Sequence, residues 1–199
     1  MNFLNSAELE QKIQKAARAY ELHKSRGIKE RGDMIGSVAN TIQRHRKTIA
    51  EIITTEMGKP ITQSLMEVDK SISFCNHYSK HFNDVVPTQI KTDAKVKTLI
   101  KYLPIGPIYV IVPFNFPFYL NFKAGLPNLL LGNVLITRNA DSLPQLGKLT
   151  EDIMIEAGLD SGEYQNVYSS PEQLDEILAH PEVAGVNFTG SSRTGAIIA

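Results

Sequence analysis

The 199-residue chain has one cysteine, no excess of charge of either sign and no long hydrophobic run. The single cysteine, Cys75, excludes a disulfide framework within the chain and leaves no set of thiolates for a zinc site. Lysine and arginine total 21, as do aspartate and glutamate, whereas nucleic-acid partners require excess positive charge. The most apolar stretch, residues 105–122, is broken by three prolines, so we expect no membrane span. These absences predict a cytoplasmic globular protein without nucleic-acid, membrane or metal partners.

The first third of the chain has helical periodicity and predicts three helices. Ser6 is the expected cap of the first helix. Asp33 is the expected cap of the second, which ends at Gly58. The third helix is expected over residues 62–82 and stops before Pro87.

From residue 95 onward the periodicity becomes that of strands. Residues 95–102 alternate between polar and apolar, which is typical of a half-exposed strand. Apolar strands then alternate with amphipathic helices, which predicts an α/β fold with a parallel sheet covered on both faces. The expected strands are 108–112, 134–137, 165–168 and 185–188, with helices over 118–131, 144–157 and 171–179.

The chain ends four residues after Gly195, in a helix that has no cap, glycine or polar tail. Four strands and an unfinished helix leave one sheet edge and part of one face uncovered. We therefore expect an incomplete sheet, and a chain that is the N-terminal part of a longer protein.

One strand leads into Gly190-Ser191 and then into a helix that contains Thr194 and Gly195. Glycine lets a ligand approach the backbone, and free N–H groups at a helix start attract phosphate. This G-S-x-x-x-G pattern differs from the G-x-G-x-x-G fingerprint. The alternative interpretation, a tight strand–helix turn without a ligand, therefore stays open.

A second segment places Asn115 between Pro113 and Pro117 at the end of an expected strand. Open parallel sheets bind ligands outside the carboxyl ends of their strands. The prolines fix the backbone on either side of Asn115, and a side-chain amide N–H is a good donor to a developing oxyanion. The alternative is a turn asparagine that satisfies its own backbone, which is the commoner use.

In order and spacing, these segments resemble the aldehyde dehydrogenase family. The resemblance is carried by Pro113-Phe114-Asn115-Phe116-Pro117, Pro127, Gly132-Asn133, Ala140, Pro144, Glu156-Ala157-Gly158 and Phe188-Thr189-Gly190-Ser191, with Glu56-Met57-Gly58-Lys59-Pro60 upstream. Within the family, residues 162–167, Ser170, His180-Pro181 and 190–195 are most similar to succinate-semialdehyde dehydrogenases.

The resemblance implies an aldehyde dehydrogenase-like fold, in which N-terminal helices precede a Rossmann-like parallel βαβ sheet. It divides the chain into a helical part of the cofactor-binding domain (1–92), a strand of the oligomerisation segment (93–104) and a Rossmann-like NAD(P)-binding part (105–199). A homo-oligomer, dimer or tetramer, is expected for the full-length form.

The resemblance also implies roles for individual residues. Asn115 would be the oxyanion donor, Ser191 would contact the cofactor pyrophosphate, and Thr194 would lie against the adenine. Further cofactor-binding residues would be Ile111, Val112, Pro113, Phe114, Arg138, Ala140, Asp141 and Gly190. Tyr119 and Lys123 would border the substrate tunnel, where Lys123 would meet a substrate carboxylate; the alternative is an exposed lysine without a role.

Arg138 and Asp141 point to different cofactors. A carboxylate accepts from the ribose 2′-hydroxyl and repels a 2′-phosphate, which favours NAD. An arginine pairs with a 2′-phosphate, which favours NADP. We expect NAD and leave NADP open.

The family's chemistry needs a cysteine thiolate and a glutamate base, which follow the Gly190–Gly195 segment in such enzymes. Cys75 lies in mid-helix without the nucleophile's motif, and we expect a buried structural thiol. The predicted function is the N-terminal part of an NAD(P)-dependent enzyme that oxidises an aldehyde, such as succinate semialdehyde, to the acid, and that is inactive as this chain alone. The alternatives are a non-catalytic truncated homologue acting as a binding or scaffold subunit, and an unrelated nucleotide-binding α/β domain.

Overall fold

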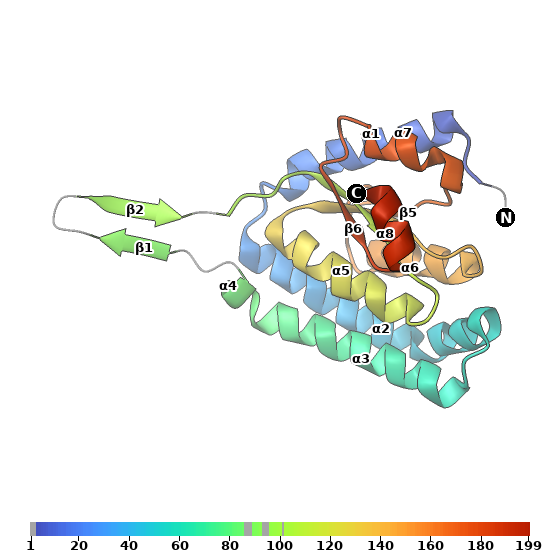
Figure 1. The fold of residues 1–199 in the computed structure, drawn as a ribbon. Helices are drawn as coiled ribbons and strands as arrows, with labels where there is room; N and C mark the ends of the chain where they lie inside the picture. The colour runs from blue at the N-terminus through green and yellow to red at the C-terminus, as the bar shows by residue number, and fades with distance from the viewer. Residues whose placement is uncertain (1–2, 86–88, 93–95, 101) are drawn as a thin grey trace.

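A four-stranded parallel sheet lies at the centre of the computed structural model, which describes residues 3–85, 89–92, 96–100 and 102–199 (Figure 1). The strand order is β5-β4-β3-β6. The strands are β3 (Pro107–Ile111), β4 (Val134–Arg138), β5 (Tyr164–Asn166) and β6 (Gly185–Phe188). All four predicted strands are therefore present, with ends that differ by at most two residues from the expected ones.

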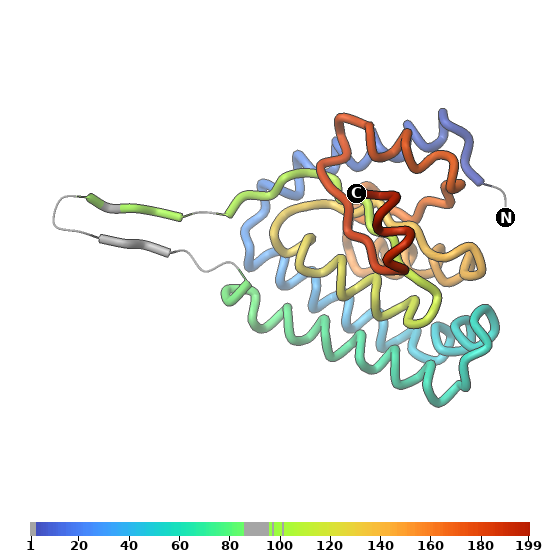
Figure 2. Tube along the Cα trace, viewed as in Figure 1, coloured from blue at the N-terminus to red at the C-terminus, as the bar shows by residue number. Residues whose placement is uncertain are grey.

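Helices cover both faces of this sheet. One face carries α2 (Ile28–Met57), α3 (Ile61–Lys80), α5 (Pro117–Leu131) and α6 (Pro144–Glu156). The other face carries α1 (Ser6–His23) and α7 (Leu174–Leu178), which follows a 3-10 turn at Pro171–Gln173. Helices α1 and α7 lie side by side, although the paired residues Ser6 and Glu176 are 170 positions apart (Figure 2).

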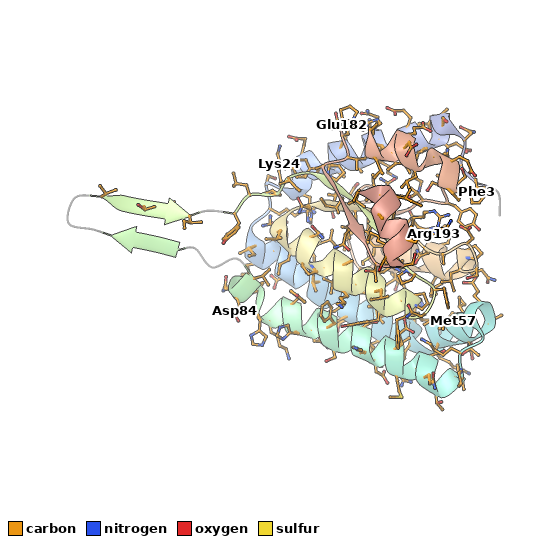
Figure 3. All side chains as sticks on the ribbon, viewed as in Figure 1. Phe3, Lys24, Met57, Asp84, Glu182 and Arg193 are labelled. Carbon is orange, nitrogen blue, oxygen red and sulfur yellow. The ribbon has the colours of Figure 1, made fainter. Side chains whose placement is uncertain are left out.

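Strand β3 shows why the sheet needs both layers. Ile108 and Val110 join the apolar cluster formed with α2, α3, α5 and α6. Tyr109, between them, joins the separate cluster formed with α1 and α7. Successive side chains of a strand point to opposite faces of the sheet. A strand that is apolar at every position therefore needs a helical layer on each face to bury its side chains. Side chains fill the space between the sheet and the helices (Figure 3).

Two predicted helix starts are wrong. Asn5, not Ser6, caps α1: its side chain accepts from Glu8 N at 2.9 Å, and the Glu8 carboxylate accepts from Asn5 N. Helix α2 begins at Ile28, so Asp33 lies inside it. Gly32 resembled a helix boundary, but it serves close packing, because a Cβ there would lie 2.8 Å from Cδ1 of Phe82. The predicted end at Gly58 is confirmed, since this residue adopts a left-handed conformation (φ 80°).

A hairpin projects from the body beyond the short helix α4 (Phe82–Val85), which carries Asp84 (Figure 3). It pairs β1 (Gln89–Thr92) with β2 (Lys97–Ile100) in antiparallel register. β2 lies within the strand expected at 95–102, whereas residues 95 and 101, and the expected helix stop at Pro87, lie outside the described residues. Strand β1 had not been predicted. It pairs with β2 across the domain boundary that was expected between residues 92 and 93. The division into domains stays a prediction.

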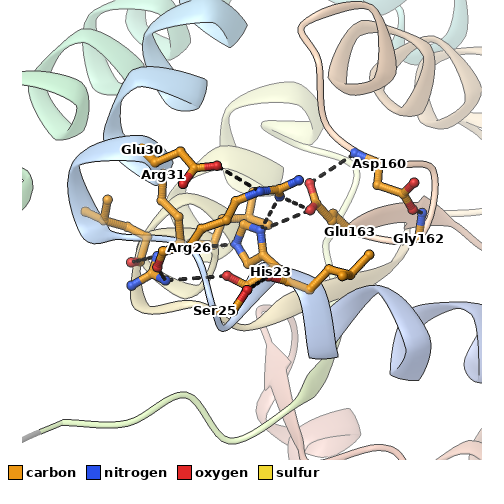
Figure 4. Close-up of polar contacts among 11 residues, drawn as sticks. His23, Ser25, Arg26, Glu30, Arg31, Asp160, Gly162 and Glu163 are labelled. Carbon is orange, nitrogen blue, oxygen red and sulfur yellow. Dashed lines mark hydrogen bonds and ion pairs between the residues drawn. The ribbon is translucent and has the colours of Figure 1, made fainter.

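A buried polar cluster joins the end of α1 to the start of β5 (Figure 4). The His23 ring contacts Leu129 O at 2.9 Å and the Glu163 carboxylate at 3.2 Å, and Arg26 pairs with the same carboxylate. Burial alone would raise the pKa of Glu163. The hydrogen bond and charge of His23, with smaller contributions from Asp160 N–H and Arg26, outweigh burial and hold that pKa below its usual value.

No helix in the described part of the chain combines the length and apolar character needed to cross a membrane.

Candidate functional site

The strand order places a topological switch point between β3 and β6. From β3 the chain proceeds to β4 and β5 on one side, and then returns to add β6 on the other side. Loops leaving the carboxyl ends of such neighbouring strands diverge, which opens a crevice where α/β proteins bind ligands. The loops after β3 and β6 therefore mark the first place to search for a site.

A cleft lies at this point and brings together the two segments singled out in the sequence. One wall comes from the loop after β3 and the start of α5, and the other from the loop after β6. Its lining residues are Pro113, Phe114, Asn115, Phe116, Leu120, Thr189, Gly190 and Ser191. A hydrogen bond from Thr189 N to Ile111 O (3.1 Å) joins the two loops at the base.

Asn115 is exposed in this cleft, and the oxygen and nitrogen of its side-chain amide differ in their hydrogen bonds. Oδ1 accepts from the N–H of Phe116 at 3.1 Å, so the turn interpretation holds for the acceptor half. Nδ2 donates to no acceptor among the described residues, so the donor half is free to bind a ligand. The hydrogen bond to Oδ1 is the one expected of a turn asparagine, and the oxyanion role expected for Nδ2 stays a prediction.

The Gly190 loop leads into α8 (Ser192–Ile198), and Ser191 is its N-cap. The Ser191 hydroxyl accepts from Thr194 N at 3.1 Å and lies 2.9 Å from Thr194 Oγ1. A Cβ at Gly190 would overlap Cζ of Phe188, so any larger residue would force that ring to move. This geometry explains the local sequence, and the cofactor roles expected for Gly190, Ser191 and Thr194 stay predictions.

A second pocket, with a cavity volume of about 260 Å³, opens at the carboxyl ends of β3 and β4. Its size is just below the roughly 300–1,000 Å³ of complete small-molecule sites, so it suits one part of a larger ligand. Four of the predicted residues, Ile111, Arg138, Asp141 and Thr194, lie here. The other lining residues are Tyr109, Ser170, Pro171, Leu174 and Ile198.

Arg138 and Asp141 form an ion pair in this pocket, with the guanidinium and carboxylate 2.7 Å apart. Arg138 also donates to Ser169 O at 3.0 Å and to Asn139 O at 3.2 Å. The hydroxyl of buried Tyr109 lies 3.0 Å from Ser169 Oγ, and burial raises the pKa of this phenol. Arg138 and Asp141, which had indicated different cofactors, are therefore paired with each other and partly neutralise each other's charge.

The remaining predicted residues lie around these two pockets. Val112 is buried and Ala140 is half-buried, and both pack in the main apolar cluster. Lys123 is exposed and lines a shallow pocket with Leu120, Ala124, Asn187 and Thr189. Tyr119 turns toward α3, where its ring lies 4.2 Å from Lys70 Nζ. Their expected roles stay predictions.

Two charged residues behind the cleft had not been predicted. Lys59 and Glu67 form an ion pair, with side chains 5% and 0% exposed. Lys59 Nζ donates to Asn115 O at 3.0 Å, and Glu67 Oε1 accepts from Phe118 N and Tyr119 N at 2.9 and 3.0 Å. The signal in the sequence was a glutamate on the inward stripe of α3, between Ser64, Val68, Ser71 and Cys75.

Cys75 is buried, as expected. Burial raises its pKa far above the usual range, so it stays a protonated thiol. No group of three or more His, Cys, Asp and Glu side chains in the described part of the chain is arranged to hold a metal ion.

The comparisons with known proteins agree with one another. A family model described as the aldehyde dehydrogenase family matches residues 2–199. A succinate-semialdehyde dehydrogenase [NADP(+)] of Deinococcus radiodurans is 29% identical over 99% of this chain and 41% of its own length. The corresponding NAD(P)+ enzyme of Escherichia coli K12 is 27% identical over 96% of this chain and 41% of its own length.

A crystal structure of succinic semialdehyde dehydrogenase from Streptococcus pyogenes, in complex with NADP+, superposes with a TM-score of 0.94. It is 27% identical, and the match covers 100% of this chain and 44% of that one. The chain therefore spans less than half the length of the relatives it matches. The predicted α/β fold with an incomplete parallel sheet is confirmed.

Proposed function

Because this chain belongs to the aldehyde dehydrogenase family, we propose that it is the N-terminal part of an NAD(P)-dependent dehydrogenase that oxidises an aldehyde to a carboxylic acid. The observation that supports this proposal best is the cleft at the switch point, where the Asn115 loop faces the Gly190 loop. The relatives are more than twice as long as the matched region, so the rest of the active site would come from a following part of the protein.

The two pockets fit a dinucleotide that extends along the carboxyl edge of the sheet. The second pocket offers the apolar side chains of Ile111, Leu174 and Ile198 to an adenine ring, and polar Arg138 and Asp141 to a ribose. Thr194 lines this pocket and bonds to Ser191, which lines the cleft, so the two pockets are adjacent. NAD(P)+ supplies the hydride acceptor when bound.

The Arg138–Asp141 pair supports NAD as the preferred cofactor, with NADP also accepted. Asp141 keeps a carboxylate oxygen at the pocket to accept from a ribose 2′-hydroxyl. It also occupies part of the Arg138 guanidinium, which already donates to Asp141, Ser169 and Asn139. A guanidinium has five N–H donors, so some of them remain available to a 2′-phosphate. The Asp141 carboxylate beside them would repel that phosphate.

Asn115 would act on the aldehyde oxygen. Asn115 lines the cleft, and its Oδ1 accepts from the Phe116 N–H, so the orientation of the amide is fixed before the substrate arrives. Such fixed donors stabilise the negative charge that develops on oxygen in the transition state. Cys75, the single cysteine, is buried, so the thiolate nucleophile would come from outside these 199 residues, and by the family resemblance the general base would lie there too.

The substrate would be a semialdehyde that carries a carboxylate, such as succinate semialdehyde. Lys123 lines a shallow pocket that shares Leu120 and Thr189 with the Asn115 cleft. An exposed ammonium beside the cleft that Asn115 lines suits a substrate that carries a negative charge at its far end. The relatives named as succinate-semialdehyde dehydrogenases support the same substrate class.

A homo-oligomer, dimer or tetramer, in the cytoplasm completes the proposal. Apolar side chains are exposed on and beside the hairpin, with Leu99 56%, Tyr102 54% and Leu103 68% exposed. Clustered exposed apolar groups are typical of an association surface.

The test begins with the intact mass of the protein from its source cells and continues with NADH formation at 340 nm. A mass well above 22.1 kDa and oxidation of succinate semialdehyde support the proposal. Butanal, which lacks the carboxylate, is the matched control substrate. Lys123→Met should raise KM for the semialdehyde and leave KM for butanal unchanged. A mass of 22.1 kDa without aldehyde-dependent NADH formation would favour a non-catalytic binding subunit instead.

A further inference from the structure

We infer that Lys59 and Glu67 form a buried frame that positions and polarises the Asn115 amide, an inference that rests on the proposed oxyanion role of Asn115. Counted over the whole residue, backbone included, Lys59 is only 6% exposed and Glu67 only 2%. Lysine and glutamate are almost never buried to this extent unless they are paired. Within the described residues, the hydrogen bonds of their charged groups go only to each other and to residues 115–119.

Glu67 acts as the N-terminal cap of α5 from a different helix. The N-cap residue of α5, Phe116, has no side-chain hydrogen bond to the first turn, and such N–H groups need a partner when buried. Glu67 Oε1 accepts from two of them, Phe118 N and Tyr119 N, at 2.9 and 3.0 Å. Its negative charge also stabilises the positive end of the helix dipole. The first turn of α5 is therefore fixed from α3.

Lys59 fixes the peptide on the other side of the same turn. Its ammonium donates to Asn115 O at 3.0 Å and lies 4.3 Å from the ring centroid of Phe116. Gly58, in its left-handed conformation, ends α2 and turns the chain so that Lys59 enters the protein. The backbone of Asn115 is thus held from the segment between α2 and α3, and the start of α5 is held from α3.

The contacts also connect the charge of Lys59 to the donor end of the Asn115 amide. The peptide group whose oxygen accepts from Lys59 has its N–H on Phe116, and this N–H donates to Asn115 Oδ1 at 3.1 Å. Hydrogen bonds in a chain polarise one another, and each strengthens the next. A cation on the Asn115 carbonyl therefore makes the Nδ2 protons better donors. Lys59 does not line the cleft, so it is a positioning residue.

The decisive experiment is a double-mutant cycle in the aldehyde-oxidising protein. The pair Lys59→Met and Glu67→Gln removes both charges together, keeps an acceptor for the α5 amides and avoids an unpaired buried charge. We expect a loss of about tenfold in kcat, as for one weakened hydrogen bond, with NADH affinity unchanged. In an Asn115→Ala background the same pair should change kcat by less than about twofold, since the group through which it acts is gone. Losses that multiply would overturn the inference.

A second lysine–glutamate pair provides the matched control. Lys12 and Glu151 are 3.2 Å apart and join α1 to α6, in a different part of the fold. Lys12→Met with Glu151→Gln removes the same charges and should leave kcat unchanged. A loss of kcat equal to that of the Lys59 and Glu67 variant would mean that any such pair acts through overall stability, and would overturn the inference.

A measurement that needs neither variants nor activity keeps the two proposals separate. In the unmodified protein, amide hydrogen exchange at Phe118 and Tyr119 should be as slow as in the second turn of α5, because both amides donate to Glu67. Fast exchange there would overturn the frame whatever the activity. If exchange is slow but the protein does not oxidise aldehydes, the proposed function and the polarising effect are refuted, whereas the positioning contacts of Lys59 and Glu67 are confirmed.

Discussion

Replacing Asp141 with asparagine is expected to shift cofactor preference toward NADP. The carboxylate is 55% exposed and pairs with Arg138 at 2.7 Å. A 2′-phosphate bound at this pocket carries a charge of about −1.5 to −2, and each unit charge near 4 Å in water costs about 1 kcal/mol. Removing the carboxylate thus stabilises bound NADPH by roughly 1.5–2 kcal/mol, or about 10–30-fold in Kd, and it frees one guanidinium donor. Binding of NADH should weaken only a few-fold, since asparagine keeps an acceptor oxygen.

Fluorescence titration with NADH and NADPH measures both Kd values without requiring turnover. Asp152→Asn is the matched control: this aspartate also pairs with a basic residue, Lys148, is 50% exposed and lies on α6 away from the pocket. The control should leave the ratio of the two Kd values unchanged. If Asp141→Asn also leaves that ratio unchanged, the assignment of the ribose to this pocket is refuted.

Three further changes test other parts of the structure. Asn115→Ala should lower kcat by about 100–1,000-fold while the Kd for NADH stays within about twofold; an equal loss of NADH binding would contradict an oxyanion role. Glu163→Gln should destabilise the protein at pH 7 by roughly 3 kcal/mol, because it breaks a buried ion pair. The pKa of Glu163 is lowered on folding, so its contribution to the free energy of unfolding is present above the unfolded pKa of about 4.3 and is lost as the pH falls through the folded pKa. Urea unfolding should therefore show that the stability difference between the variant and the unmodified protein disappears in acid. A difference that is constant with pH would refute this. Glu56→Ala should cost about 1 kcal/mol in the same urea assay, because its carboxylate accepts from two N–H groups at the start of α6; no loss would show that water replaces it.

The main features of the fold were predictable because they depend on local pattern. The central strands β3 and β4 are mainly apolar runs that end near Pro113 and at Asn139, and both are buried on both faces of the sheet, which is typical of parallel strands. The end of α2 at Gly58 follows from the backbone conformation that glycine alone adopts cheaply. Asn115 and Gly190 were found for the same reason, since loops after parallel strands meet at one edge of the sheet.

Features that depend on tertiary contacts were missed. The start of α2 at Ile28 is set by packing of the helix, including Phe82 against Gly32, and not by the Gly32-Asp33 step that resembles a cap. Strand β1 has the sequence Gln-Ile-Lys-Thr and takes its conformation from pairing with β2. Nothing in the spacing of Lys59 and Asn115, 56 residues apart, indicates that they touch.

The Arg138–Asp141 pair is an intermediate case. Both residues were recognised as candidates for the cofactor site, but they were considered one at a time, so they predicted opposite cofactors. Arg138 ends β4 and Asp141 lies in the loop that follows, where sequence separation does not fix side-chain direction. Only the structure shows that the two charges pair with each other and that the pocket presents them as one unit.

A crystal structure of the protein with NAD+ bound would show directly whether the cofactor occupies the two pockets. We expect the adenosine in the pocket lined by Ile111, Arg138 and Asp141, with the rest of the dinucleotide leading past Ser191 toward Asn115. A dinucleotide bound elsewhere on the protein, or an empty switch-point cleft at saturating NAD+, would contradict that expectation.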